Sequence, residues 1–366
     1  MKKKKIDRNL KKIDKEMNNS FKYVREWAEK VIKYPVLGWP GPYMFAVEES
    51  LQESMPEPYP GFLTLDMNFR LSFLELRTKL KDYLSNTDIK RPYNILIMAK
   101  PGSGKSYFVN CLSKVASIPL VGGNLSGKNS IENLITVINE VRNYKVVNKV
   151  PILSLDEADS DPNNISLLLP LLYDGEISYK GQLLKIGRCI IICIVSDTKL
   201  VNYIKKQQNE KFILKKYQKI VDFKSRFNGG FFSIPSINEK RRRFDKVWIA
   251  FELLRKRFGY VGSIPIYFLQ FIANSKFLHE VRSLEALINA IPNSAFHHGE
   301  ELVIDSDCVD LIKKDMDKET AGPLSYHISC GDKALQYLEK CRRLNKDNIN
   351  SEHFVFYDFY TWKDLE

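Results

Sequence analysis

Residues 99 to 106 read AKPGSGKS and directly follow a short apolar run. Gly102 and Gly104 stand where a loop must turn its backbone N–H groups inward around a phosphate. In such a loop Lys105 reaches the β- and γ-phosphates of a nucleotide, and the hydroxyl of Ser106 is a ligand for magnesium. The stretch therefore predicts a site for a nucleotide and a divalent cation.

The first position of this loop departs from the usual pattern, because Ala99 replaces a glycine. That position governs entry into the loop rather than contact with phosphate, so alanine is tolerated if its φ is negative. The residues expected to bind the nucleotide are Pro101, Gly102, Ser103, Gly104, Lys105, Ser106 and Tyr107.

A second apolar run, Ile152–Leu155, ends in the two acids Asp156 and Glu157. A carboxylate at the end of a buried strand costs desolvation energy unless a cation or hydrogen bonds meet it. Magnesium would meet Asp156, which makes Ser106 and Asp156 the candidate metal ligands. Glu157 could orient and polarise the attacking water. An ordinary turn after a strand is the alternative, but the phosphate loop favours the metal site.

The elements that must position these residues alternate along the chain. Strand-like runs lie at Asn94–Met98, Pro119–Gly122, Val150–Leu155, Cys189–Val195 and Phe231–Ile234, with longer helical patterns between them. This alternation predicts an α/β fold with a mostly parallel sheet covered by helices on both faces. Helical patterns near 239–258, 264–275 and 280–291 follow without a convincing strand, which predicts a separate all-α domain.

The two motifs and the segments after them resemble the AAA+ ATPase superfamily over about residues 90 to 295. The resemblance implies a three-layer αβα P-loop NTPase domain followed by a small helical lid. The stretch LLPLLYDGEISYKGQLLKIGRCIIICIVSDT resembles the family's helix, hairpin and fourth strand. The family keeps a polar sensor residue after that strand, and Asp197 aligns with it best. Because an acid near phosphate is electrostatically unfavourable, Ser196 is the other candidate.

Two arginines fall where the family has functional arginines. Arg226, in the sequence FKSRF, resembles the arginine finger that a neighbouring subunit supplies to the γ-phosphoryl group. Arg282, in EVRSLEALI, resembles the second sensor of the lid. A surface arginine is the alternative for Arg226, and an ion pair with Glu280 or Glu285 is the alternative for Arg282.

The resemblance implies an ATP hydrolase with ATP and Mg²⁺ as cofactors. Its candidate catalytic residues are Glu157, Lys105, Arg226, Asp197, Ser196 and Arg282. Because a finger acting in trans has no use in a monomer, a homo-oligomeric ring or spiral is expected, by family analogy a hexamer. The expected function is the remodelling of a protein client or nucleoprotein complex. A nucleotide-gated scaffold or DNA-associated regulator with slow hydrolysis, which recruits a partner protein, is the open alternative.

The resemblance covers neither end of the chain. The predicted domains are a helical and Pro/Gly-rich N-terminal extension (1–88), the nucleotide-binding domain (89–237), the helical lid (238–296) and a C-terminal extension (297–366).

The composition bears on partners and location. Lys and Arg outnumber Asp and Glu by 56 to 44, a formal net charge of +12, which suits a nucleic acid but is also common in Lys-rich chains. Candidate sites of non-specific phosphate contact, or simply solvated faces, are Lys2–Lys5, Lys205–Lys206, Lys215–Lys216 and Lys240–Arg243. The sequence has no apolar stretch suited to a signal peptide or a membrane span, so we expect a cytoplasmic protein. It also has no CxxC pair, so we expect reduced thiols, and Cys189 and Cys193 are expected to pack in the core.

Overall fold

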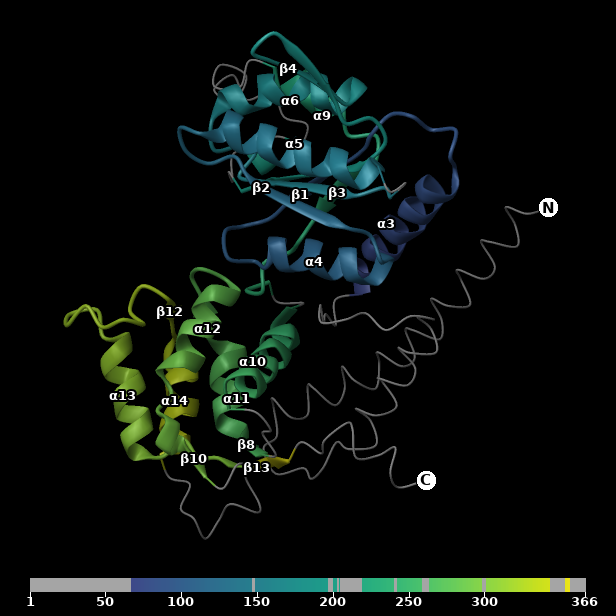
Figure 1. The fold of residues 1–366 in the computed structure, drawn as a ribbon. Helices are drawn as coiled ribbons and strands as arrows, with labels where there is room; N and C mark the ends of the chain where they lie inside the picture. The colour runs from purple at the N-terminus through teal and green to yellow at the C-terminus, as the bar shows by residue number, and fades with distance from the viewer. Residues whose placement is uncertain are drawn as a thin grey trace, which may run out of the picture. The chain divides into compact units, whose positions relative to one another are not determined.

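The computed structural model describes residues 67–146, 149–196, 200–202, 204, 219–239, 242–258, 263–297, 301–342 and 353–355. They form two compact units, one ending at Ser236 and the other beginning at Ile237, and each is described by itself (Figure 1). The predicted extension before Met67 and most of the aromatic C-terminal tail lie outside the described residues. Within the described ranges, no helix combines the length and the apolar character that a membrane crossing requires.

The first unit is built on a five-stranded sheet in the order β2-β3-β6-β1-β7, with every neighbouring pair parallel. The strands are β1 (Tyr93–Met98), β2 (Leu120–Asn124), β3 (Ile152–Asp156), β6 (Ile190–Val195) and β7 (Gly230–Ser233). Ile190 pairs with both Tyr93 and Ile152, so β1, β3 and β6 start level and end at one common edge. The predicted parallel sheet is confirmed, and its central strands are apolar because both faces are covered.

Helices cover the sheet on both sides. In Figure 1, α5 (Ser130–Val146), α6 (Pro162–Asp174) and α9 (Ile220–Ser225) lie on one side, and α3 (Met67–Ser85) and α4 (Lys105–Ala116) lie on the other. A two-stranded hairpin, β4 (Glu176–Tyr179) and β5 (Gln182–Lys185), separates α6 from β6. The unit is therefore a three-layer α/β structure.

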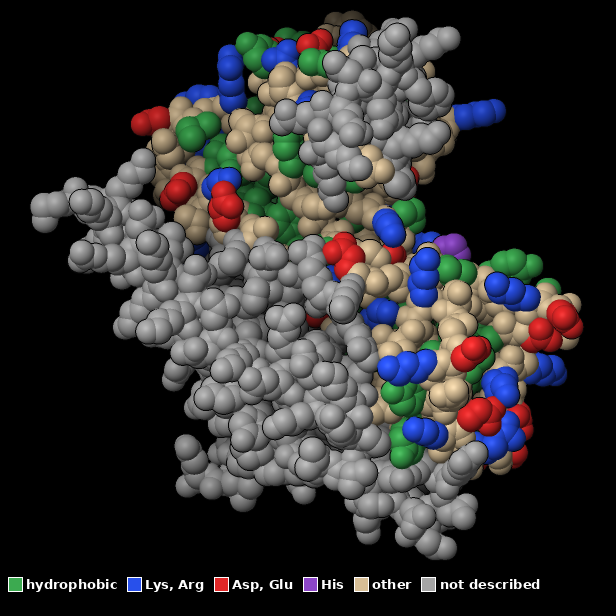
Figure 2. All heavy atoms as spheres, turned by 180° about the vertical axis from the view of Figure 1, so that it is seen from behind, with side chains coloured by type: hydrophobic (Ala, Val, Ile, Leu, Met, Phe, Trp, Pro, Cys, Tyr) green, Lys and Arg blue, Asp and Glu red, His purple; other side chains and the backbone are tan. Residues whose placement is uncertain are grey.

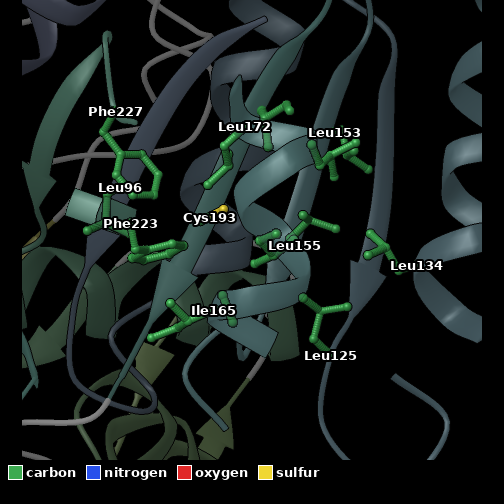
Figure 3. Packing of buried hydrophobic residues seen from close by; sticks show 14 of the residues in the cluster. Leu96, Leu125, Leu134, Leu153, Leu155, Ile165, Leu172, Cys193, Phe223 and Phe227 are labelled. Atoms are coloured by element: carbon green, nitrogen blue, oxygen red, sulfur yellow. The ribbon is translucent and has the colours of Figure 1, made fainter. Parts of the chain in front are cut away.

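The core under α5, α6 and α9 is mostly aliphatic and also includes Phe223 and Phe227 (Figure 3). Leu96, Leu153 and Cys193 of the strands pack there with Leu134 of α5 and Leu172 of α6. Cys189 belongs to the same cluster, which confirms the prediction that both strand cysteines are core residues.

The opposite face of the sheet is aromatic. Phe69 and Phe73 of α3 meet Phe108 of α4, and the Phe108 and Phe232 rings stack with centroids 4.8 Å apart. At the C-terminal end of α3 the Arg188 guanidinium donates to three backbone carbonyls, which satisfies groups that a helix end leaves unpaired. The predicted boundary at residue 88 would leave out α3, yet α3 shares its core with the sheet.

The second unit contains five helices among its described residues: α10 (Arg243–Phe258), α11 (Ile266–Asn274), α12 (Val281–Ala290), α13 (Ser306–Met316) and α14 (Asp332–Cys341). It also contains short strands. β8 (Ser263–Pro265), β10 (Phe296–His297), β11 (Glu301–Leu302) and β13 (His353–Val355) form one sheet, and β9 (Lys276–Phe277) pairs with β12 (Ile328–Ser329). The expectation of an all-α domain is wrong in this respect, because strands of two or three residues leave no periodic pattern.

The core of this unit runs past the predicted boundary between 296 and 297. Val309 of α13 and Leu338 of α14 are buried in one cluster with Phe268 and Phe271 of α11 and Leu287 of α12. Residues 301–341 therefore complete the hydrophobic core of the helices that precede them.

Candidate nucleotide-binding site

The loop between β1 and α4 has the backbone that a phosphate cradle needs. Gly102 and Gly104 take left-handed conformations with φ of 79° and 81°, which residues with a Cβ adopt only at a cost. Gly104 is the N-cap of α4 and has no side chain to cap the helix, and the N-terminus of a helix favours an anion. Ala99 is buried, is not among the residues of positive φ, and donates its N–H to Val195 O. Alanine there simply extends the β1–β6 ladder.

The other side chains of the loop differ in how deeply they are buried. Ser103 is 3% exposed, and its Oγ has no hydrogen-bond partner among the described residues. A buried hydroxyl without a partner is unfavourable unless a ligand supplies one, so this atom fits a phosphate group. Pro101 and Tyr107 are exposed.

Lys105 connects the loop to the neighbouring strand. It is 7% exposed, and its Nζ donates to Ser196 Oγ at 2.6 Å. Ser196 follows β6 directly, so the ammonium group lies between the ends of β1 and β6. The structure thus brings Ser196, one of the two candidates for the polar sensor, next to Lys105. The other candidate, Asp197, lies outside the described residues.

Ser106 and Asp156 are brought together from α4 and β3. Ser106 Oγ donates to Asp156 Oδ2 at 2.9 Å, and the backbone N–H of Glu157 donates to Asp156 Oδ1 at 2.9 Å. A hydroxyl and a carboxylate oxygen at this separation are hard ligands of the kind that Mg²⁺ takes, usually with phosphate oxygens and water as the others. The predicted pair of metal ligands is therefore compatible with a magnesium ion.

Glu157 follows β3 in an unusual conformation and environment. Its φ is 57°, in the left-handed region. Burial raises the pKa of its carboxyl group, the charges of Asp156 and Asp159 raise it further, and Lys105 lowers it. A carboxylate with a raised pKa is a better acceptor for the proton of a water molecule than an ordinary glutamate.

Asp159 is a residue of this site that the sequence interpretation missed. It is 5% exposed, and its Oδ2 accepts the backbone N–H of Ser196 at 2.7 Å. The N–H of Ala158 donates to Ile194 O, so the chain after β3 lies beside the end of β6. The Asp159 carboxylate is therefore placed at the end of that strand. The sequence does contain a signal for it, because Asp159 is the third acid of the run DEAD. The sequence analysis gave a role only to the first two acids of that run.

Arg226 does not join this group. Its carbonyl oxygen accepts from Asn94 Nδ2, at the beginning of β1, whereas the phosphate loop follows the end of β1. Ala99 follows Asn94 by five residue steps, which is roughly 16 Å at about 3.3 Å per residue. The arginine therefore lies near the opposite edge of the sheet from the glycine loop of its own chain.

Arg282 lies in the second unit, on α12, where its side chain is exposed. Near it, the rings of His279 and His327 meet edge to face at 5.5 Å, and Ser283 Oγ lies 3.2 Å from His327 Nδ1. Burial, His279 and Arg282 lower the pKa of His327.

Most of the predicted basic clusters lie outside the described residues. Among Lys240–Arg243, Arg242 is 1% exposed and its Nε lies 2.6 Å from the buried carboxylate of Asp245, so it is not a surface cation. Lys2–Lys5, Lys205–Lys206 and Lys215–Lys216 lie outside the described residues. On the face in Figure 2, Lys and Arg side chains of the described residues are interspersed with Asp and Glu.

The sheet, its flanking helices and the glycine loop together fit an α/β P-loop NTPase fold. In comparisons with known proteins, no family model matches the chain, and no curated protein matches it in sequence. Among solved structures, NtrX from Brucella abortus in complex with ADP is similar, with a TM-score of 0.39 and 15% identity over 68% of this chain and 58% of that one. NtrX in complex with ATP has a TM-score of 0.38 and 16% identity over 68% and 55%. The chain thus spans little more than half the length of NtrX.

Proposed function

We propose that this protein binds ATP and Mg²⁺ and hydrolyses ATP to ADP and phosphate, as an AAA+-type ATPase that remodels a protein or nucleoprotein partner. One observation carries the proposal: polar side chains at or just after the ends of three different strands meet at one edge of the sheet. They are Lys105, Ser106, Asp156, Glu157 and Ser196. Phosphoryl transfer needs mainly positioning and charge stabilisation, and these side chains supply both.

Each residue has a distinct role in this proposal. The N-terminus of α4 and the Lys105 ammonium bind the phosphates, and Ser106 and Asp156 hold the metal ion. When bound, Mg²⁺ would supply positive charge to offset the negative charge on the phosphate oxygens. Ser196 orients the Lys105 ammonium, and Glu157 orients a water molecule and accepts its proton.

The position of Arg226 favours an assembly. Because it lies at the other edge of the sheet from its own phosphate loop, it is suited to reach the nucleotide of a second copy. A ring or spiral in which each copy completes the next site is the assembly that we propose. The client is a protein or nucleoprotein, and nucleic acid is a candidate component because of the net charge of +12.

The decisive experiment replaces Glu157 by Gln, which keeps the shape and removes the proton acceptor. We expect ATP turnover to fall by about 10²- to 10⁴-fold while ATP affinity is retained. The matched control is Glu140→Gln, because Glu140 is an exposed carboxylate on α5 of the same unit. Turnover that is slow in the wild type and unchanged in Glu157→Gln would contradict the proposal and favour a nucleotide-gated scaffold.

A further inference from the structure

The guanidinium group of Arg226 is stacked on an aromatic ring from another element. Its Cζ lies 4.2 Å from the ring centroid of Tyr173, the next-to-last residue of α6. The guanidinium of Arg91 lies over the same ring at 4.8 Å. Arg91 is also near Asp174, with Nη2 3.8 Å from Oδ1. Two arginines from segments far apart in the sequence thus converge on one tyrosine.

The backbone beneath this stack is fixed by a buried amide. Asn94 is 1% exposed, and its Nδ2 donates both to Leu172 O, beside Tyr173, and to Arg226 O, at 2.5 and 2.8 Å. Asn228 Oδ1 in turn accepts the N–H of Asn94. The end of α6 and the end of α9, which lie on one side of the sheet in Figure 1, are therefore tied together through β1.

The stack lies at the surface. Tyr173 is 43% exposed, and the nearby chain of α9 and β7 exposes two more apolar side chains, Val221 at 61% and Phe231 at 45%. Arg226 Nε is buried and has no hydrogen-bond acceptor among the described residues. This part of the chain thus combines a cation with exposed apolar side chains, which fits a protein partner that presents an anion.

We propose that Tyr173 is a positioning residue for Arg226, and that the anion is the nucleotide bound to a second copy of this chain. This inference rests on the function proposed above. Stacking on the ring restricts the rotamers of a long side chain before the partner arrives, so less conformational entropy is lost on docking. Stacking covers a face of the guanidinium plane, so the two Nη groups at its edge can still donate to phosphate oxygens.

The test is a set of three variants with turnover measured at saturating protein concentration. Tyr173→Leu removes the ring, and we expect kcat to fall by about 10- to 100-fold while KM for ATP changes by less than about threefold, because a misplaced finger affects the transition state. Tyr173→Phe keeps the ring and should retain near wild-type kcat. Tyr326→Leu, at a tyrosine that is 67% exposed in the other unit, is the control and should leave kcat unchanged.

Mixing two variants then shows whether the loss of turnover in Tyr173→Leu arises on the arginine side or on the phosphate side of the contact between copies. Tyr173→Leu has an intact phosphate site and Glu157→Gln has an intact finger, so their mixture should recover turnover that neither variant shows alone. A mixture of Tyr173→Leu with Arg226→Ala should not recover, because both changes affect the same side of the contact. Loss of ATP binding in Tyr173→Leu, an increase in kcat, or no recovery with Glu157→Gln would overturn the inference. Full turnover in Glu157→Gln alone would instead contradict the proposed function.

Discussion

Lys105 shows how one residue joins two strands at the candidate site. Its buried ammonium group lies at the start of α4 and donates to Ser196 after β6. Since a nucleotide phosphate would be bound mainly by this charge and by the helix N-terminus, we expect Lys105→Ala to abolish detectable ATP binding. Titration with a fluorescent ATP analogue measures the affinity.

A lysine elsewhere on the same helix provides the control. Lys114 is exposed in the last turn of α4, and Lys114→Ala should bind the analogue like the wild type. Affinity retained in Lys105→Ala would contradict the assignment of the phosphate loop, and circular dichroism of both variants checks that each is folded.

At this scale the sequence predicted what depends on local spacing. Gly102, Gly104 and Ser106 were predicted from a short motif; in the structure both glycines have positive φ, and Ser106 donates to Asp156. Asp159 could not be assigned in this way, because its contact with Ser196 joins residues 37 positions apart. The stacking of Arg226 on Tyr173 depends likewise on two helices meeting in three dimensions.

At the scale of elements, α3 was the principal omission. A helix before the first strand was evident from the sequence, but nothing local showed which unit it would join. Its aromatic side chains decide this, because Phe69 and Phe73 pack against Phe108 of α4. The strands of the main sheet were predictable because runs buried on both faces are continuously apolar, whereas strands such as β10 and β12 are too short to form a pattern.

Phe73 gives a test of this packing. It is 2% exposed, so Phe73→Ala removes a buried ring and should lower the stability of the first unit by about 3 to 5 kcal/mol. Hydrogen exchange of peptides that cover β1 and β6 reports this unit specifically.

Glu75→Ala on the same helix is the matched control. Glu75 is exposed and forms a surface ion pair with Lys79, so its loss should cost less than about 1 kcal/mol. Equal protection of β1 in Phe73→Ala and the wild type would show that α3 does not stabilise the sheet.

At the scale of the whole molecule, the proposed phosphate loop and Arg226 of one chain lie near opposite ends of β1. Asn94, which donates to the carbonyl oxygen of Arg226, precedes Ala99 by roughly 16 Å of extended chain. If a second copy completes the site, ATP turnover per subunit should rise with protein concentration and then reach a plateau. A steady-state assay over a range of concentrations checks this, and analytical ultracentrifugation over the same range should show assembly with the same midpoint. Turnover per subunit that stays constant while the protein passes from monomer to oligomer would exclude completion in trans.

The left-handed backbone at Glu157 has a consequence for protein engineering. A residue with a Cβ costs roughly 1 to 2 kcal/mol in this conformation, whereas glycine or asparagine accepts it more easily. A redesign that optimised folding alone would therefore replace Glu157 and remove the acid on which the proposed hydrolysis depends. Position 157 is thus one where a more stable sequence and a more active one are expected to differ.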